Sequence, residues 1–306
     1  MSFKYMNPGF AEWLDTAAGT TVKGDQYNRY GGVAFWNSQD KVDVRLPEMP
    51  GKHLYIKASL WLNPEPTGMG YFEVSTTDST GKKSTGFGGW LSYGTWYFYR
   101  YHKTSYSELS KLTCVRYGAL NDVLIHINKD TTGAPIVTIN LNGTVIYNDY
   151  DWDSDIYGYA KLRSEVADVL LSNIIISDRP IEMKERVVPL AVTATETDLP
   201  TDDEGNYVTT EADKMVLYTL DAGDILERFG EDSKITGIGF ACVPGYSTGD
   251  AVTRLIGIRK PQDGEVEELG SSLLSTAKDG KTVVGAAMDI SFAELQGSQF
   301  GMKTGA

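Results

Sequence analysis

The chain has 306 residues, more than most single domains, and it carries 41 acidic against 28 basic residues for a net charge of −13 at pH 7. The acidic excess lies in the C-terminal part, because residues 190–306 hold 20 acidic and 9 basic side chains whereas residues 1–189 hold 21 and 19. A surface of this sign repels nucleic-acid phosphates and anionic lipids, and no stretch approaches the roughly 18 apolar residues of a membrane span. Neither nucleic acid nor membrane insertion is therefore expected.

Apolar and polar residues alternate over short stretches along most of the first 180 residues, the pattern of half-buried strands. In residues 53–62, for example, Leu54, Ile56, Ala58 and Leu60 share one face. The glycine-rich residues 87–94 read instead as an exposed turn. The predicted strands lie near residues 20–23, 32–36, 42–46, 53–62, 70–76, 96–102, 112–117, 122–128, 136–141, 144–148 and 166–177.

The clearest local signal is the hairpin at residues 137–147. Its two alternating strands flank Asn142-Gly143, the pair that best tolerates positive φ at both central positions of a type I′ turn. An apolar strand that ends at Asp178-Arg179-Pro180 follows later. Together they predict an antiparallel β-sandwich over residues 1–185.

A second domain is expected at residues 186–306. It begins with an acidic, turn-rich connection near residues 194–207 and continues with β-rich segments from residue 215 onward. Ser291 and Glu294 have the spacing of a helix capping box. The sequence thus predicts an all-β protein in which a smaller, acidic β-sandwich follows the first one.

Two clusters of aromatic residues could stack on sugar rings, because tryptophan and tyrosine present large apolar faces with a polar tip. One surrounds residues 87–101 and the other surrounds residues 147–157. In the first cluster the alternation places Tyr97 on the face opposite Trp96, so that one face is core. The candidate carbohydrate-binding residues are Trp90, Tyr93, Tyr150 and Trp152.

The second cluster also contains acids at alternate positions, which an extended strand would place on one side. Repulsion among such carboxylates favours a hard cation such as Ca²⁺, although the glycine and distal glutamate of an EF-hand are absent. A solvated acidic loop is the alternative. The candidate metal ligands are Asp149, Asp151, Asp153 and Asp155, and apart from this Ca²⁺ no cofactor is expected.

No linear catalytic motif is present. Glycoside hydrolysis requires two facing carboxylic acids, and the acidic run Glu265-Val-Glu-Glu268 lacks the pattern that retaining enzymes on related sandwiches carry. His53, His102 and His126 are isolated in strand-like sequence, which implies neither a catalytic triad nor a zinc site. The sequence therefore predicts a protein that is not an enzyme.

Residues 31–181 resemble concanavalin A-like or laminin G-like jelly rolls. The resemblance is carried by the paired strands around Asn142-Gly143 and by the closing strand at residues 169–181. The remainder is similar to modules of tailed-bacteriophage virion proteins, through residues 233–241, 253–259 and 293–303. The first family includes lectins, adhesion modules and viral surface domains.

The resemblance implies a structural component of a bacteriophage-like virion, in the tail, a fibre or the capsid surface. Such a protein is expected to be made in the host cytoplasm, since no secretory signal is visible, and to form a homo-oligomer among other virion proteins. Its lectin-like sandwich could contact a host cell-surface glycan. A free carbohydrate-binding module is the alternative, and a glycan-cleaving enzyme is a third.

Overall fold

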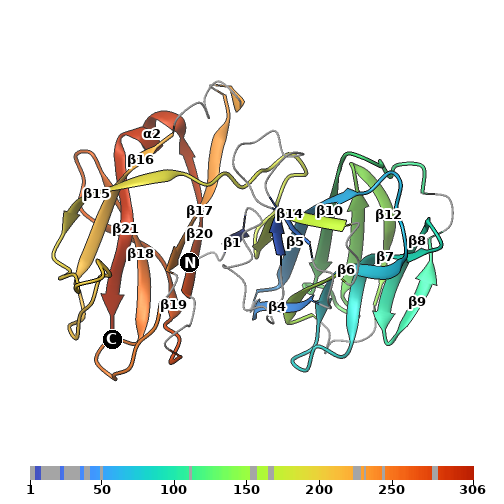
Figure 1. Ribbon diagram of the computed structural model, residues 1–306, viewed down its shortest axis with the longest axis horizontal. Coiled ribbons are helices and arrows are strands. Elements are labelled where there is room, and N and C mark those ends of the chain that lie inside the picture. The colour runs from blue at the N-terminus through green and yellow to red at the C-terminus, as the bar shows by residue number, and fades with distance from the viewer. Residues whose placement is uncertain are drawn as a thin grey trace. The chain divides into compact units, whose positions relative to one another are not determined.

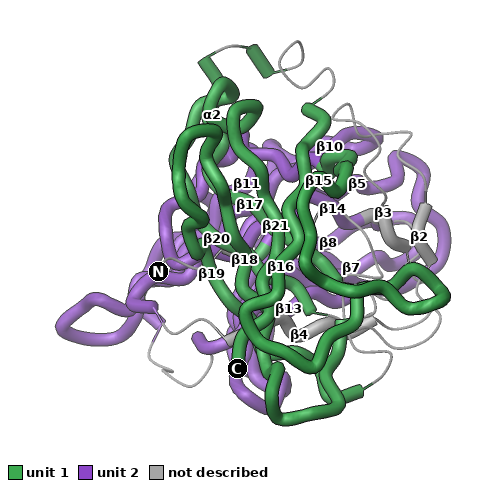
Figure 2. The backbone as a smooth tube through the Cα atoms, turned by 90° about the vertical axis from the view of Figure 1, so that its left-hand side faces the viewer, with its two compact units in different colours: residues 1–5, 189–306 green, residues 6–188 purple. Residues whose placement is uncertain are grey.

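The computed structural model describes residues 4–7, 21–23, 35–37, 42–48, 51–109, 112–151, 157–164, 169–222, 229–230, 232–242, 245–277 and 282–306. The chain divides into two compact units (Figure 2). Unit 2 comprises residues 6–188, and unit 1 comprises residues 1–5 together with residues 189–306. The chain thus passes from unit 2 to unit 1 between Val188 and Pro189, whereas the sequence placed a domain boundary after residue 185.

Unit 2 is a sandwich of two sheets whose neighbouring strands run antiparallel (Figure 1). The larger sheet has eight strands in the order β12-β11-β10-β5-β14-β3-β2, with β1 also paired to β14. Their bounds are β1 Lys4–Asn7, β2 Thr21–Lys23, β3 Phe35–Asn37, β5 His53–Leu62, β10 Leu120–Asn128, β11 Ile136–Leu141, β12 Thr144–Tyr150 and β14 Val169–Ser177.

The second sheet of unit 2 has six strands in the order β4-β13-β6-β7-β8-β9. Its sequence-distant members are brought together by pairing of β13 with both β4 and β6. The bounds are β4 Val42–Glu48, β6 Met69–Thr77, β7 Ser84–Ser92, β8 Thr95–Lys103, β9 Ser105–Glu108 and β13 Tyr159–Ser164.

The core of unit 2 lies between these sheets and combines aliphatic with aromatic side chains. The four residues predicted to share one face of β5 are all fully buried, namely Leu54, Ile56, Ala58 and Leu60. The six-stranded sheet contributes rings in mutual contact, namely Phe72, Phe87, Trp96 and Phe98. Burial of a large apolar side chain contributes roughly 1.5–3 kcal/mol, so this layer is the main source of stability.

The predicted hairpin is confirmed as β11 and β12. Asn142 and Gly143 have φ angles of 53° and 89°, as a type I′ turn requires. The Asn142 side chain also donates hydrogen bonds to the carbonyl oxygen of Cys114 and to Oδ1 of Asn121, at 2.7 and 2.9 Å. The turn is therefore fixed to the neighbouring loop as well as by its own backbone.

Three local predictions are wrong. Residues 194–197, expected to belong to a turn-rich connection, form the end of a strand that pairs with residues 216–218. Residues 112–117 form turns instead of a strand, because the Asn121 side chain bonds to both the backbone nitrogen and the carbonyl oxygen of Arg116. The glycine-rich segment expected to be an exposed turn is mostly the strand β7, with Phe87 and Leu91 buried. Glycine there serves close approach of neighbouring strands and not chain reversal.

The outer face of the eight-stranded sheet is partly covered by the segment that leads out of unit 2. Ile181 and Val187 pack with Ile175 in a buried apolar cluster. Beside them, the fully buried Lys57 ammonium donates a hydrogen bond to the carbonyl oxygen of Glu185 at 2.8 Å and lies 3.3 Å from Asp122.

Unit 1 is also antiparallel and consists of a five-stranded sheet in the order β15-β16-β21-β18-β19 and a two-stranded sheet of β17 and β20. Its helix α2, Phe292–Gln296, begins with the predicted capping box of Ser291 and Glu294. No helix in the described part of the chain has the length and hydropathy to cross a bilayer. The strand bounds are β15 Ala191–Thr197, β16 Met215–Asp221, β17 Lys234–Cys242, β18 Arg254–Pro261, β19 Glu267–Leu273, β20 Thr282–Ser291 and β21 Ser298–Gly305. The predicted all-β fold class, a jelly-roll sandwich followed by a smaller β domain, is confirmed.

Candidate functional site

The outer face of the six-stranded sheet carries three aromatic residues in one row, at matching positions of three adjacent strands. Tyr71 on β6 pairs with Trp90 on β7, which pairs in turn with Tyr97 on β8. The rings of Tyr71 and Trp90 are nearly parallel, with centroids 6.0 Å apart and an interplanar angle of 7°. Trp90 and Tyr97 each remain 41% exposed. We call Tyr71, Trp90 and Tyr97 the aromatic row.

A polar patch, formed by Glu73, Ser75 and Lys161, lies beside the aromatic row on the same face. Ser75 donates a hydrogen bond from Oγ to Oε1 of Glu73. The Lys161 ammonium lies 3.9 Å from Oε2 of Glu73 and donates to the carbonyl oxygen of Gly81 at 3.1 Å. All three side chains are almost fully buried, so their charges and hydrogen bonds hold a fixed arrangement.

Two further contacts join the row to charged and hydroxyl groups. The Arg163 guanidinium on β13 lies 4.5 Å from the centre of the Tyr71 ring, in cation–π contact. Tyr99, two residues after Tyr97, points to the same face and meets Tyr106 edge to face. Burial, with a smaller contribution from Glu108, raises the pKa of the Tyr99 hydroxyl, which thus stays protonated to higher pH than an ordinary tyrosine.

Gly86 and Gly88 lie on this same outer face of β7. A Cβ atom on Gly88 would lie 2.3 Å from the carbonyl oxygen of Phe72 and 2.3 Å from Cε2 of Tyr101. A Cβ atom on Gly86 would lie 2.3 Å from the carbonyl oxygen of Val74. Contacts this short do not occur, so these positions admit only glycine unless the neighbouring strand or the Tyr101 ring moves.

The structure brings together only part of the predicted carbohydrate site. Trp90 belongs to the aromatic row, and Tyr93, 89% exposed, lies in the turn that ends its strand. Tyr150 is also exposed, but it pairs with Ile136 on the outer face of the other sheet, so it lies on a different surface. Trp152 lies outside the described residues.

Sequence reasoning missed Tyr71 and the polar patch. The alternation of β8 did indicate that Tyr97 and Tyr99 share the face opposite Trp96, and the burial of Trp96 shows that theirs is the outer face. No comparable local signal links Glu73 with Lys161, because their strands are neighbours only through the pairing of β6 with β13.

The predicted metal ligands are placed differently from one another. Asp149 is exposed, whereas the Asp151 side chain is fully buried and pairs with the Arg100 guanidinium. Its carboxylate lies 3.0 Å from Arg100 and 2.8 Å from His102, and it accepts a hydrogen bond from Thr85 at 3.1 Å. Because β12 and β8 belong to different sheets, Asp151 ties the two layers of the sandwich together.

The other two predicted ligands, Asp153 and Asp155, lie outside the described residues. Within the described part of the chain, no group of three or more histidine, cysteine, aspartate or glutamate side chains is arranged to hold a metal ion. The Ca²⁺ site stays a prediction, and the ion pairs of Asp151 compete with it for that carboxylate.

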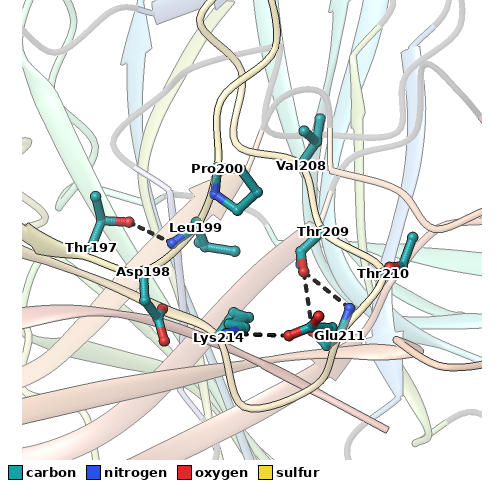
Figure 3. Close-up of a pocket in the computed structure, with 9 residues that line it drawn as sticks. All are labelled: Thr197, Asp198, Leu199, Pro200, Val208, Thr209, Thr210, Glu211 and Lys214. Carbon is teal, nitrogen blue, oxygen red and sulfur yellow. Dashed lines mark hydrogen bonds and ion pairs between the residues drawn. The ribbon is translucent and has the colours of Figure 1, made fainter.

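Unit 1 contains a separate open pocket of about 780 Å³ between the ends of β15 and β16 (Figure 3). Its polar groups bond to one another: Thr197 Oγ1 accepts from the backbone nitrogen of Leu199 at 3.0 Å, and Lys214 lies 3.2 Å from Glu211. None of the residues that line the pocket is aromatic. The aromatic row is therefore the better candidate for a sugar-binding surface.

The chain matches no protein-family model and no curated protein sequence. In fold it is similar to the solved structure of a cellulose-induced protein, Cip1, with 14% identity over 55% of this chain and 89% of that chain and a TM-score of 0.38. It is also similar to an endo-β-1,4-glucuronan lyase from the fungus Trichoderma reesei, with 11% identity over 56% and 94% of the two chains and a TM-score of 0.36. A third is the carbohydrate recognition domain of Emp46p in its metal-free form, with 12% identity, 58% and 97% coverage and a TM-score of 0.36.

The prediction that the chain is not an enzyme is corrected by these comparisons, because polysaccharide lyases are among the proteins of similar fold. That prediction depended on the absence of a linear motif. The structure shows why this was insufficient: charged groups such as Glu73 and Lys161 are far apart in sequence and become neighbours through strand pairing. Absence of a motif in one strand therefore does not exclude catalysis on a sheet face.

Proposed function

We propose that unit 2 is a carbohydrate-binding domain and that its binding surface is the outer face of the six-stranded sheet. The observation that carries the proposal is the aromatic row of Tyr71, Trp90 and Tyr97, in which Trp90 and Tyr97 stay exposed. Exposed aromatic rings in a row offer flat apolar surfaces on which the C–H faces of sugar rings stack.

The dimensions of the row favour an oligosaccharide over a single sugar. Adjacent strands lie about 4.8 Å apart, so a row across three strands spans about 10 Å. The neighbouring Arg163 and Tyr99 supply donors for hydroxyl or carboxylate oxygens. Apolar stacking with a few fixed polar groups is the usual composition of a small-molecule site.

Binding of polysaccharides by the purified full chain tests this proposal, with a glycan array and affinity electrophoresis as readouts. We expect Trp90→Ala and Tyr97→Ala each to weaken binding at least tenfold. Tyr150→Ala is the matched control, because this tyrosine is similarly exposed on another surface and should leave binding unchanged. Absence of binding by the unmodified chain, or equal binding by Trp90→Ala, would refute the proposal.

Two additions to the same experiment address the other expectations. Repeating the array with Ca²⁺ and with a chelator tests the predicted cation dependence. Incubating each bound polysaccharide with the protein and measuring released reducing ends tests whether the surface also cleaves its ligand.

We further propose that the domain contacts glycans as part of a bacteriophage-like virion, made in the host cytoplasm and present in several copies. Support for this role comes from the resemblance of residues 233–241, 253–259 and 293–303 to virion modules. Mass spectrometry of purified particles tests it, and particles that lack the chain would contradict it.

A further inference from the structure

Two histidines that are far apart in sequence meet on the outer face of the eight-stranded sheet, opposite the proposed carbohydrate surface. His53 is on β5 and His126 is on β10, where it pairs with Tyr55. Both point outward, because Leu54 and Ile127 beside them point into the core. Nδ1 of His53 lies 3.2 Å from Nε2 of His126.

Stacking holds this pair of imidazoles in place. The Tyr55 ring lies parallel to the His126 ring, with centroids 4.1 Å apart and an interplanar angle of 2°. The two imidazole centroids are 5.4 Å apart. Both histidines are half-buried, so solvent reaches them although their orientations are restricted.

Burial lowers the pKa of His126 to about 4, and the neighbouring His53 adds to this effect. His126 is therefore neutral at physiological pH. Neutral imidazole is the form that binds metal ions, so no proton has to be removed from His126 before it can coordinate one.

We propose that His53 Nδ1 and His126 Nε2 chelate a divalent transition-metal ion such as Cu²⁺, Ni²⁺ or Zn²⁺, with water in the remaining positions. Two metal–nitrogen bonds of about 2.05 Å whose nitrogens are 3.2 Å apart enclose an angle of about 100°. This value lies between the right angle of square-planar or octahedral sites and the tetrahedral angle, so one metal ion can reach both nitrogens at ordinary bond lengths once the rings turn toward it. The proton shared by the two nitrogens moves to the other nitrogen of its own ring.

The chemistry of the pair selects the class of metal. Imidazole suits Cu²⁺, Ni²⁺ and Zn²⁺, whereas Ca²⁺ and Mg²⁺ prefer oxygen ligands. With two protein ligands the site is weak and open, and the affinity should follow the order of Cu²⁺ above Ni²⁺ and Zn²⁺. It is independent of the Ca²⁺ site predicted near Asp149, and of the carbohydrate surface.

Isothermal titration of the untagged full chain with CuCl₂, ZnCl₂ or CaCl₂ at pH 7.5 tests the proposal. We expect one equivalent of Cu²⁺ and of Zn²⁺ to bind, Ca²⁺ not to compete, and His53→Ala and His126→Ala each to weaken binding at least tenfold. His102→Gln replaces the third histidine and should bind as the unmodified chain does.

A measurement on the unmodified chain tests the proposal even if a variant fails to fold. In long-range ¹H–¹⁵N spectra of the unmodified chain, Zn²⁺ should shift Nε2 of His126 and Nδ1 of His53 and leave the ring nitrogens of His102 in place. Unshifted His126 signals at saturating Zn²⁺, or binding that survives both alanine substitutions, would overturn the assignment.

Discussion

Replacing Asp151 by asparagine should destabilise unit 2 by about 3 kcal/mol, because it leaves Arg100 without its anionic partner in the interior of the sandwich. At an effective dielectric constant of about 20, unit charges 3.0 Å apart interact by roughly 5 kcal/mol. Loss of one partner of a buried pair costs about 3–5 kcal/mol after desolvation is included. The lower end applies here, since the Arg100 side chain keeps 13% exposure and its contact with the Tyr147 ring at 4.0 Å.

Tryptophan fluorescence during urea unfolding measures this change in unit 2 alone. The six tryptophans of the chain all lie between residues 6 and 188, so unfolding of unit 1 does not contribute to the signal. Asp149→Asn is the matched control: the exposed carboxylate two residues earlier should change the unfolding free energy by no more than about 0.5 kcal/mol.

A loss below about 1 kcal/mol for Asp151→Asn would refute the assignment of this residue to an ion pair that joins the sheets. So would equal losses for both variants that disappear when Ca²⁺ is removed, because that pattern belongs to a shared metal site. A double-mutant cycle with Arg100→Met isolates the pair, and a coupling energy near zero would contradict the geometry.

The other predictions concern buried groups of unit 2. Burial lowers the pKa of Lys57 to about 8 from 10.5. Between these pH values the folded state binds fewer protons than the unfolded state, so folding becomes more favourable as the pH rises. The unfolding free energy relative to Lys57→Met should therefore increase by about 3 kcal/mol from pH 8 to 10.5. If the unfolding free energies of the unmodified chain and of Lys57→Met, measured with urea, change with pH in parallel, this prediction is wrong. His126 should titrate near pH 4 in histidine NMR spectra, and a midpoint near 6.5 would show that it is not desolvated. Gly88→Ala should cost about 1–3 kcal/mol and weaken polysaccharide binding, because its Cβ meets the Phe72 carbonyl oxygen, whereas Gly133→Ala has open space and should do neither.

Local features of unit 2 and unit 1 could be predicted because their causes are local. The inward face of β5 follows from strand alternation, the turn at Asn142-Gly143 from tolerance of positive φ, and the start of α2 from the capping box at Ser291. In each case residues within a few positions of one another decide the structure, so the sequence pattern contains the information.

The glycine-rich segment 87–94 shows where local reasoning failed. Glycine favours turns in general, yet Gly86 and Gly88 lie within a strand because neighbouring strands approach there too closely for a side chain. The partner of Asp151 likewise depends on distant strands, since Arg100 comes from the other sheet and no local pattern around Asp151 indicates it.

The sequence by itself determined the fold class, strands such as β5, β11 and β12, and the placement of Trp96 and Tyr97 on opposite faces of β8. Only the tertiary structure decided that Trp90 lies between Tyr71 and Tyr97 and that His53 meets His126. The physical reason is that side chains on adjacent strands become neighbours through strand order and register. These are set by packing of the whole sandwich, and no short stretch of the chain specifies them.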